Sequence, residues 1–157
     1  MSFRRELKIK IDQKNLSKFR DWLNQNKFSP LHKKRLVHSI YFDNLNMQMF
    51  FHSIEGIVPR KKIRIRNYDS EYYDQTKNLL EKKISSVENR FKISNSISDT
   101  TNLLKLGIFD KDYGVCKPVV RVSYNREYYE YSNLRVTIDT NISYKKFDRN
   151  VSKPWRK

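Results

Sequence analysis

The sequence contains very little cysteine or glycine and no long apolar run. Its single cysteine, Cys116, excludes an internal disulfide framework and any zinc site built from several cysteines. The three glycines and four prolines form no flexible linker, so the 157 residues are expected to fold around one main core. No stretch of about 18 apolar residues is present, and the first residues contain no apolar signal-peptide region. These features predict a soluble, cytoplasmic chain without a transmembrane segment.

Positive charge is the property that the sequence has in excess. The chain carries 33 Lys and Arg against 17 Asp and Glu, which gives a formal net charge of +16. Such an excess indicates a polyanionic partner, which could be a nucleic acid, polyphosphate, a nucleotide or an acidic membrane surface. Aromatic residues make up 13% of the chain and supply large apolar side chains for a core, which argues against disorder.

The most regular pattern of charge lies between Arg60 and Tyr68. Successive side chains of a strand point to opposite faces, so Lys62, Arg64 and Arg66 share one face and Ile63 and Ile65 the other. This stretch is therefore predicted to be a strand with an apolar face and a cationic face. The cationic face fits either an open nucleic-acid surface or the inside of a barrel.

Similar alternation predicts most of the remaining structure. Further strands are expected at residues 4–11, 36–43, 78–85, 88–93, 119–129 and 135–144. A helix is expected from Asp12, as its N-cap, to Asn26, with Leu16, Phe19, Trp22 and Leu23 towards the core. A second helix is expected at 99–106 with Gly107 as its C-terminal cap, residues 45–54 as a short helix or irregular apolar segment, 28–34 as a loop and 69–77 as a hairpin loop. The predicted class is α+β with a mainly antiparallel sheet and two or three helices.

Carboxylates on the cationic strands help to separate the two readings of the basic face. Glu6 stands near Lys8, and Glu81 near Lys83. A nucleic-acid face gains nothing from carboxylates, whereas a metal-assisted phosphate site uses acids for the metal and cations for the phosphate oxygens. The barrel interior is thus favoured, and a basic nucleic-acid surface remains the alternative.

Seven short motifs occur in the order in which they occur in the VTC domain, and the chain resembles that family over residues 4–144. The motifs are Arg5-Glu6-Leu7-Lys8, Ser39-Ile40-Tyr41-Phe42-Asp43-Asn44, Glu55-Gly56, Lys62-Ile63-Arg64-Ile65-Arg66-Asn67-Tyr68, Leu80-Glu81-Lys82-Lys83, Tyr124-Asn125-Arg126 and Arg135-Val136-Thr137-Ile138-Asp139-Thr140. The VTC domain is a polyphosphate polymerase of the CYTH-like, triphosphate tunnel metalloenzyme superfamily. The resemblance implies an antiparallel tunnel barrel that transfers the γ-phosphate of ATP to polyphosphate with Mn²⁺ or Mg²⁺.

The resemblance also implies roles for individual residues. Arg64, Arg66 and Lys83 would serve catalysis; Lys8, Lys62, Arg90, Tyr124, Arg126 and Arg135 would bind substrate; and Glu6 and Glu81 would hold the metal or orient the basic residues. The partners would be ATP, polyphosphate and a membrane-associated protein. The tunnel domain is expected at residues 1–145, with a tail at 146–157.

The family usually continues to a closing strand of Glu-x-Lys type, which this chain does not contain before Lys157. The barrel is therefore expected to lack its last strand. That expectation keeps a second function open, a non-catalytic module that binds polyphosphate, with nucleic-acid binding as a third.

Overall fold

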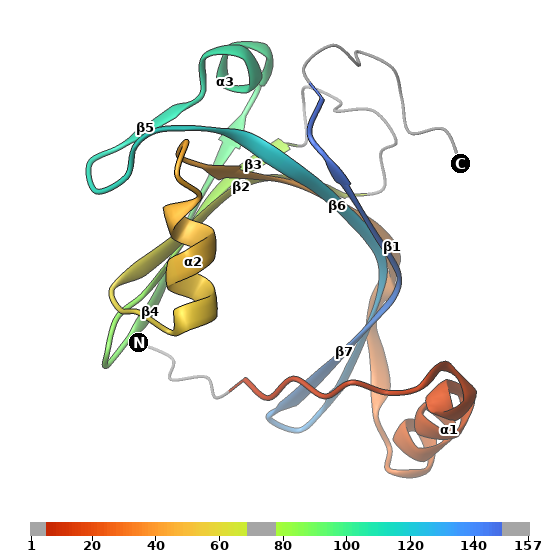
Figure 1. Cartoon of the computed structure of the whole chain (residues 1–157). Coiled ribbons are helices and arrows are strands. Elements are labelled where there is room, and N and C mark those ends of the chain that lie inside the picture. Colours follow the sequence, from red (N-terminus) through yellow and green to blue (C-terminus); the bar gives the residue numbers. More distant parts are fainter. Residues whose placement is uncertain (1–5, 69–77, 149–157) are drawn as a thin grey trace. The chain divides into compact units, whose positions relative to one another are not determined.

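The computed structural model describes residues 6–68 and 78–148 (Figure 1). The chain divides into two compact units: Met1–Lys33 with Glu127–Ile138 form a smaller unit, and Lys34–Arg126 with Asp139–Lys157 form a larger one. The predicted hairpin loop at 69–77 and most of the predicted tail lie outside the described residues.

The described residues form seven strands, three α-helices and one short 3-10 helix. The helical elements are η1 (Gln13–Asn15), α1 (Leu16–Gln25), α2 (Gln48–Glu55) and α3 (Thr101–Leu106). The strands are β1 (Ser29–Asp43), β2 (Arg60–Tyr68), β3 (Asn78–Ser85), β4 (Arg90–Ile97), β5 (Ile108–Asp110), β6 (Gly114–Tyr131) and β7 (Leu134–Lys146). None of the helices in the described ranges is long and apolar enough to span a bilayer.

One sheet organises the larger unit. Its strand order is β4-β3-β2-β1-β6-β5, with β7 paired to β6. The pairs β1–β2, β2–β3, β3–β4 and β5–β6 are antiparallel. The strands curl as they follow one another (Figure 1), and among the described residues no pairing joins β4 to β5 or β7. The predicted α+β class with a mainly antiparallel, barrel-like sheet is confirmed, and the sheet has the form of a curled half-barrel in the described residues.

The apolar face of β2 packs into the main core, as the alternation predicted. Ile63 and Ile65 are fully buried beside Ile40 of β1. The helix α2 adds Met49 to this core. The α2 N-terminus is fixed by the buried carboxylate of Asp43, which accepts hydrogen bonds from the backbone N–H groups of Met49 and Phe50 at 3.0 and 2.9 Å.

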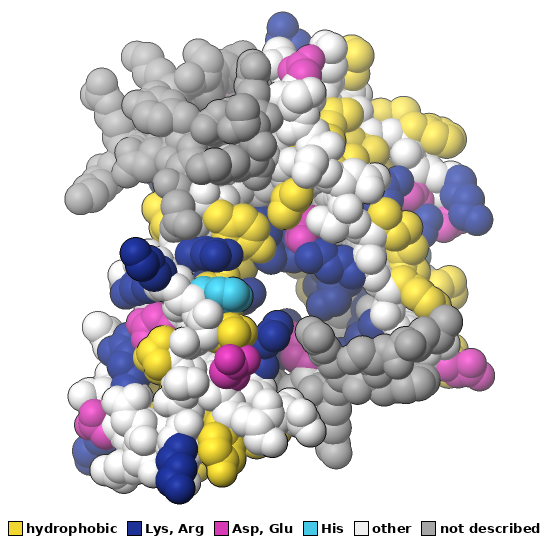
Figure 2. Space-filling model, turned by 180° about the vertical axis from the view of Figure 1, so that it is seen from behind, with side chains coloured by type: hydrophobic (Ala, Val, Ile, Leu, Met, Phe, Trp, Pro, Cys, Tyr) yellow, Lys and Arg dark blue, Asp and Glu magenta, His cyan; other side chains and the backbone are white. Residues whose placement is uncertain are grey.

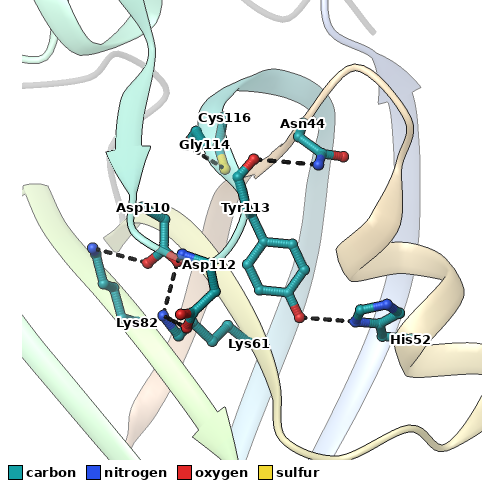
Figure 3. A network of polar contacts seen from close by, with 9 residues as sticks. All are labelled: Asn44, His52, Lys61, Lys82, Asp110, Asp112, Tyr113, Gly114 and Cys116. Carbon is teal, nitrogen blue, oxygen red and sulfur yellow. Dashed lines mark hydrogen bonds and ion pairs between the residues drawn. The ribbon is translucent and has the colours of Figure 1, made fainter.

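A polar network ties the β5–β6 hairpin to the same face of the sheet (Figure 3). Lys61 of β2 donates to Asp110 at 2.8 Å, and Lys82 of β3 donates to the same buried carboxylate at 3.4 Å. Tyr113 adds a second link, because its hydroxyl lies 3.0 Å from Nδ1 of His52 on α2. Both lysines are thus paired with the carboxylate of Asp110, and Lys61 also pairs with Asp112 of the same hairpin.

The smaller unit is built around α1. Leu23 of α1 is fully buried beside Phe28 and Ile138 of β7. The chain leaves α1 by a Schellman turn, in which the N–H of Phe28 bonds to the carbonyl of Leu23 at 3.0 Å and Lys27 adopts a positive φ of 63°. This turn brings Phe28 back onto the helix that precedes it.

Four sequence predictions are wrong in detail. Residues 6–12 are not a strand, and Leu7 and Ile9 are 80% and 73% exposed, because in the described residues no strand pairs with this segment. Asp12 makes no side-chain capping bond. Residues 29–34 belong to β1 rather than to a loop, and Trp22 is 49% exposed rather than part of the core.

The strand β5 was also missed. It has only three residues, too few for alternation to mark it. The predicted cap of the helix before it is present: Gly107 closes α3 with a φ of 92°, and its N–H bonds to the Leu103 carbonyl at 3.0 Å.

Candidate functional site

The face of β2 opposite the core carries the candidate site. In antiparallel strands, directly opposite residues point to the same face. Tyr41, Arg64, Glu81 and Ser94 form one such row across β1, β2, β3 and β4. The next row in one direction is Lys62, Lys83 and Lys92, and in the other direction it is Ser39, Arg66, Leu79 and Ser96. Three lysines on three neighbouring strands therefore stand side by side.

This placement brings positive charges together. Like charges directly opposite each other on a sheet repel and destabilise the pairing. Lys62 and Lys83 are both exposed, and Lys92 is half exposed. Water lowers this repulsion, and Lys92 is also paired with Glu81. The row is therefore suited to a ligand with several negative charges.

Glu81 lies at the centre of the cationic face. It is 1% exposed, and its carboxylate accepts from Arg64 Nε at 2.6 Å and pairs with Lys92 at 2.5 Å, with Arg66 Nε 3.8 Å away. Burial acts to raise the pKa of Glu81, but the Lys92 hydrogen bond and the charges of Arg64 and Arg66 outweigh it and lower the pKa. Glu81 is thus an ionised carboxylate that holds three cations in place.

Tyrosine hydroxyls hold the two arginines from the other side. Arg64 donates to the Tyr41 hydroxyl at 3.0 Å, and Arg66 donates to the Tyr124 hydroxyl at 3.1 Å. Desolvation is the largest effect on Tyr124 and raises its pKa, so it stays protonated. Each hydroxyl accepts from an arginine and can still donate its own proton to a bound anion.

Arg126 lies beside Tyr124, with its guanidinium 5.0 Å from the ring centroid. The guanidinium donates two hydrogen bonds to Asp139, at 2.6 and 2.7 Å. This planar, bidentate arrangement fixes its orientation. Arg126 and Asp139 therefore extend the polar surface of the larger unit from β2 to β6 and β7.

The larger unit brings together most of the residues singled out from the sequence. Arg64, Arg66, Lys62, Lys83 and Glu81 lie on one face of β2 and β3; Arg90 lies exposed at the start of β4, one row beyond Lys92; and Tyr124 and Arg126 lie on β6. Glu6, Lys8 and Arg135 belong to the smaller unit. Glu6 and Lys8 are 4.0 Å apart on an exposed segment.

Lys92, Tyr41 and Ser39 were not proposed as site residues from the sequence. Lys92 could have been predicted as a site residue, because it lies two residues after Arg90 and so on the same face of β4. Tyr41 and Ser39 could not, since their place depends on the register of β1 against β2.

The described carboxylates do not form a ready-made metal site. Within residues 6–68 and 78–148, no cluster of three or more His, Cys, Asp or Glu side chains is arranged to hold an ion. Both oxygens of Glu81 already face cations. Glu6 and Glu81 lie in different units. The contacts of Glu81 are with basic side chains, and both of its predicted roles stay predictions.

The surface has mixed charge with an excess of cations. Lys and Arg side chains recur over the face seen in Figure 2, with Asp and Glu side chains among them.

A family model, described as the VTC domain, matches residues 3–157 of the sequence. A search among curated proteins found no match.

Proposed function

Because the chain belongs to the VTC domain family, we propose that it is a polyphosphate polymerase-like enzyme that transfers the γ-phosphate of ATP to a polyphosphate chain. The observation that carries the proposal is the row of Lys62, Lys83 and Lys92 beside Arg64 and Arg66. Consecutive phosphates in a chain carry closely spaced negative charges, and three neighbouring strands, about 5 Å apart, each present a lysine to such a chain. The face of the sheet is thus matched to a linear polyanion.

The transfer itself asks little covalent chemistry of the protein. Phosphoryl transfer is accelerated mainly by positioning and by stabilising charge on the transferred group. The attacking atom is a terminal phosphate oxygen that is already ionised, so the enzyme needs neither a nucleophile nor a strong general base. Arg64 and Arg66 would hold the phosphates between them, and the hydroxyls of Tyr41 and Tyr124 would each donate a hydrogen bond.

The basic rows would position the rest of the phosphate chain. Lys62, Lys83 and Lys92 lie one row along the strands from Arg64, so they would contact phosphates next to those that Arg64 holds. Glu81 keeps Arg64 and Lys92 pointing into the site. Arg90 and Arg126 would contact phosphates farther along the face.

A divalent ion would enter with the nucleotide. Mg²⁺ and Mn²⁺ are commonly held by substrate phosphate oxygens with only one or two protein carboxylates, and they neutralise charge on the phosphates. We propose this form of binding because Glu81 is already occupied by cations. The protein residues described above do not depend on the ion for their orientation.

The test is synthesis of polyphosphate from ATP and Mn²⁺ by the purified chain. We expect wild-type protein to form polymer, and Arg66→Lys to lose at least about tenfold of the rate, because the ammonium cannot replace a planar guanidinium that also holds Tyr124. Lys105→Arg, on an exposed part of α3, changes a basic residue just as conservatively and should keep the wild-type rate. Failure of wild-type protein to form polymer or release phosphate would reject the catalytic proposal.

Non-catalytic binding of polyphosphate is the second candidate. It is favoured by the ion pairs that surround Glu81, because they occupy the carboxylate at the centre of the cationic face as the described residues form it. This candidate predicts tight polyphosphate binding that is insensitive to Mn²⁺ and no turnover of ATP. Metal-dependent turnover would exclude it.

A further inference from the structure

The smaller unit exposes five large apolar side chains in the described residues, and three of them lie on α1, β6 and β7 at the margin of its core. Trp22 of α1 is 49% exposed, Tyr131 at the end of β6 is 44% exposed and Leu134 at the start of β7 is 62% exposed. We call these three residues the aromatic edge. Exposed apolar groups gathered in one small unit mark an interaction surface more often than scattered ones do.

Phe28 joins the aromatic edge to the buried core. Its ring centroid lies 6.2 Å from that of Trp22 and 5.5 Å from that of Tyr131. Leu134 lies on the same face of β7 as Val136 and Ile138. Val136 packs against the core of the smaller unit, and Ile138 is buried in it. The aromatic edge is therefore the solvent-facing margin of a packed core and is held in position by it.

The geometry of the rings decides what kind of partner can bind. Phe19 is stacked on Trp22, with 5.9 Å between the centroids and 8° between the planes. Phe28 lies against Trp22 as well, at a tilt of 34°. A nucleic-acid base needs an open ring face, and Trp22 has two aromatic neighbours. The part of the indole that remains exposed suits the interface of a lipid bilayer, where tryptophan and tyrosine place apolar rings against acyl chains and polar atoms among headgroups.

Basic residues lie near Trp22, Phe28 and Leu134 in the sequence. Lys18 precedes Trp22 by one helical turn, Lys27 precedes Phe28, and Arg135 follows Leu134. All three cations are exposed. Exposed apolar rings with neighbouring cations are the combination that binds the surface of an anionic bilayer.

Two acids lie close to the aromatic edge in the sequence. Asp21 precedes Trp22, and Glu130 precedes Tyr131. Their charges oppose an anionic surface, so the affinity is expected to be moderate and dependent on salt. Neutralising one of these acids by substitution should therefore strengthen binding.

We infer that the aromatic edge docks the smaller unit onto an anionic phospholipid surface. The three apolar side chains enter the headgroup region, and Lys18 and Lys27 face the lipid phosphates and carboxylates. This contact does not use the cationic face of the larger unit, so it holds or fails independently of the proposed phosphotransfer.

The test is binding of the full chain to vesicles of phosphatidylcholine with and without phosphatidylserine. A Trp155→Phe background leaves Trp22 as the single tryptophan, so its fluorescence reports on the edge itself. We expect the emission of Trp22 to shift to the blue with phosphatidylserine vesicles only. Leu134→Glu should weaken partitioning about tenfold, since it replaces an inserted side chain by a charge that the surface repels.

Two further variants serve as controls. Phe109→Glu makes the same kind of change at a residue of the larger unit that is 72% exposed, and it should leave binding unchanged. Asp21→Asn removes a repelling charge from an exposed position and should tighten binding to vesicles with phosphatidylserine.

The inference is overturned if Leu134→Glu binds as well as wild type, or if Phe109→Glu weakens binding equally. It is also overturned if single-stranded oligonucleotides shift the Trp22 emission and vesicles do not. That result would assign the aromatic edge to nucleic acid.

Discussion

Glu81 shows how one residue organises the candidate site. Its buried carboxylate is bound by Arg64 and Lys92, and Arg66 lies close by. Removing one partner of a buried ion pair leaves the others uncompensated, which costs more than the pair itself contributes. Glu81 therefore links the stability of the sheet to the charge of its basic face.

Glu81→Gln is expected to lower the free energy of unfolding by about 3 kcal/mol near neutral pH, because three cations lose their shared anion. The folded pKa of Glu81 is lowered, so the stability that it contributes is present above the unfolded pKa of about 4.3 and is lost as the pH falls through the folded value. Urea unfolding of both proteins across this pH range is the measurement. A difference between wild type and variant that does not shrink in acid would contradict the account.

Asp110 has a similar part on the apolar face, where it neutralises Lys61 and Lys82 (Figure 3). Burial acts to raise its pKa, but hydrogen bonds from Lys61 and the Asp112 backbone lower it overall. Asp110→Asn is expected to cost about 2 kcal/mol in chemical denaturation, since two partly buried lysines lose their partner.

The matched control for this variant is Asp112→Asn. Asp112 also pairs with Lys61, but its side chain is 51% exposed, so its loss should cost well under about 1 kcal/mol. Equal losses of unfolding free energy for the two variants would show that burial does not determine how much each carboxylate of this network contributes to stability.

At the level of elements, the close approach of Gly107 to β6 determines how α3 leads into β5. A Cβ at this position would lie 2.5 Å from the carbonyl oxygen of Cys116, and the φ of 92° is unfavourable for other residues. Gly107→Ala should therefore destabilise the larger unit by at least about 3 kcal/mol, through both strain and displacement of the β5–β6 hairpin.

Gly56 provides the comparison, because it also has a positive φ, of 74°, but a Cβ there would meet nothing within 4 Å. Gly56→Ala should cost only the conformational penalty of about 1 kcal/mol. Thermal unfolding of both variants separates the two effects. Similar melting temperatures for both would argue that the approach to Cys116 does not matter.

The alternation of apolar and polar residues correctly predicted strands in which one face is buried. In β2, Ile63 and Ile65 face the core and Arg64 faces away from it, so the sequence pattern and the packing coincide. The same pattern at residues 6–11 predicted a strand that is not there, because alternation reports a potential strand and pairing decides whether it forms. The turn after α1 was equally beyond prediction, since Lys27 stands where glycine is usual.

The composition of the candidate site was easier to predict than its geometry. Arg64 and Arg66 could be assigned to one face of β2 from the sequence, because they are two residues apart in a strand. The alignment of Lys83 with Lys62 and Lys92 required the register of three strands. The pairing of Arg126 with Asp139 depends on the hairpin of β6 and β7, which brings residues distant in the sequence together.

For the whole molecule, the net charge of +16 means that binding an anion relieves repulsion as well as adding contacts. The cationic face predicts that a chain of phosphates binds more tightly than a single phosphate, because it reaches both the arginine row and the lysine row. The affinity should fall as salt is added.

Calorimetric titration of tripolyphosphate into wild type, Lys83→Ala and Lys105→Ala tests the central claim most directly. Both variants remove one exposed lysine and one positive charge, but Lys83 lies in the row with Lys62 and Lys92 and Lys105 lies on α3. We predict an affinity about tenfold weaker for Lys83→Ala and close to wild type for Lys105→Ala. Equal affinities for the two variants would show that tripolyphosphate responds only to net charge, and would contradict a phosphate site on this face of the sheet.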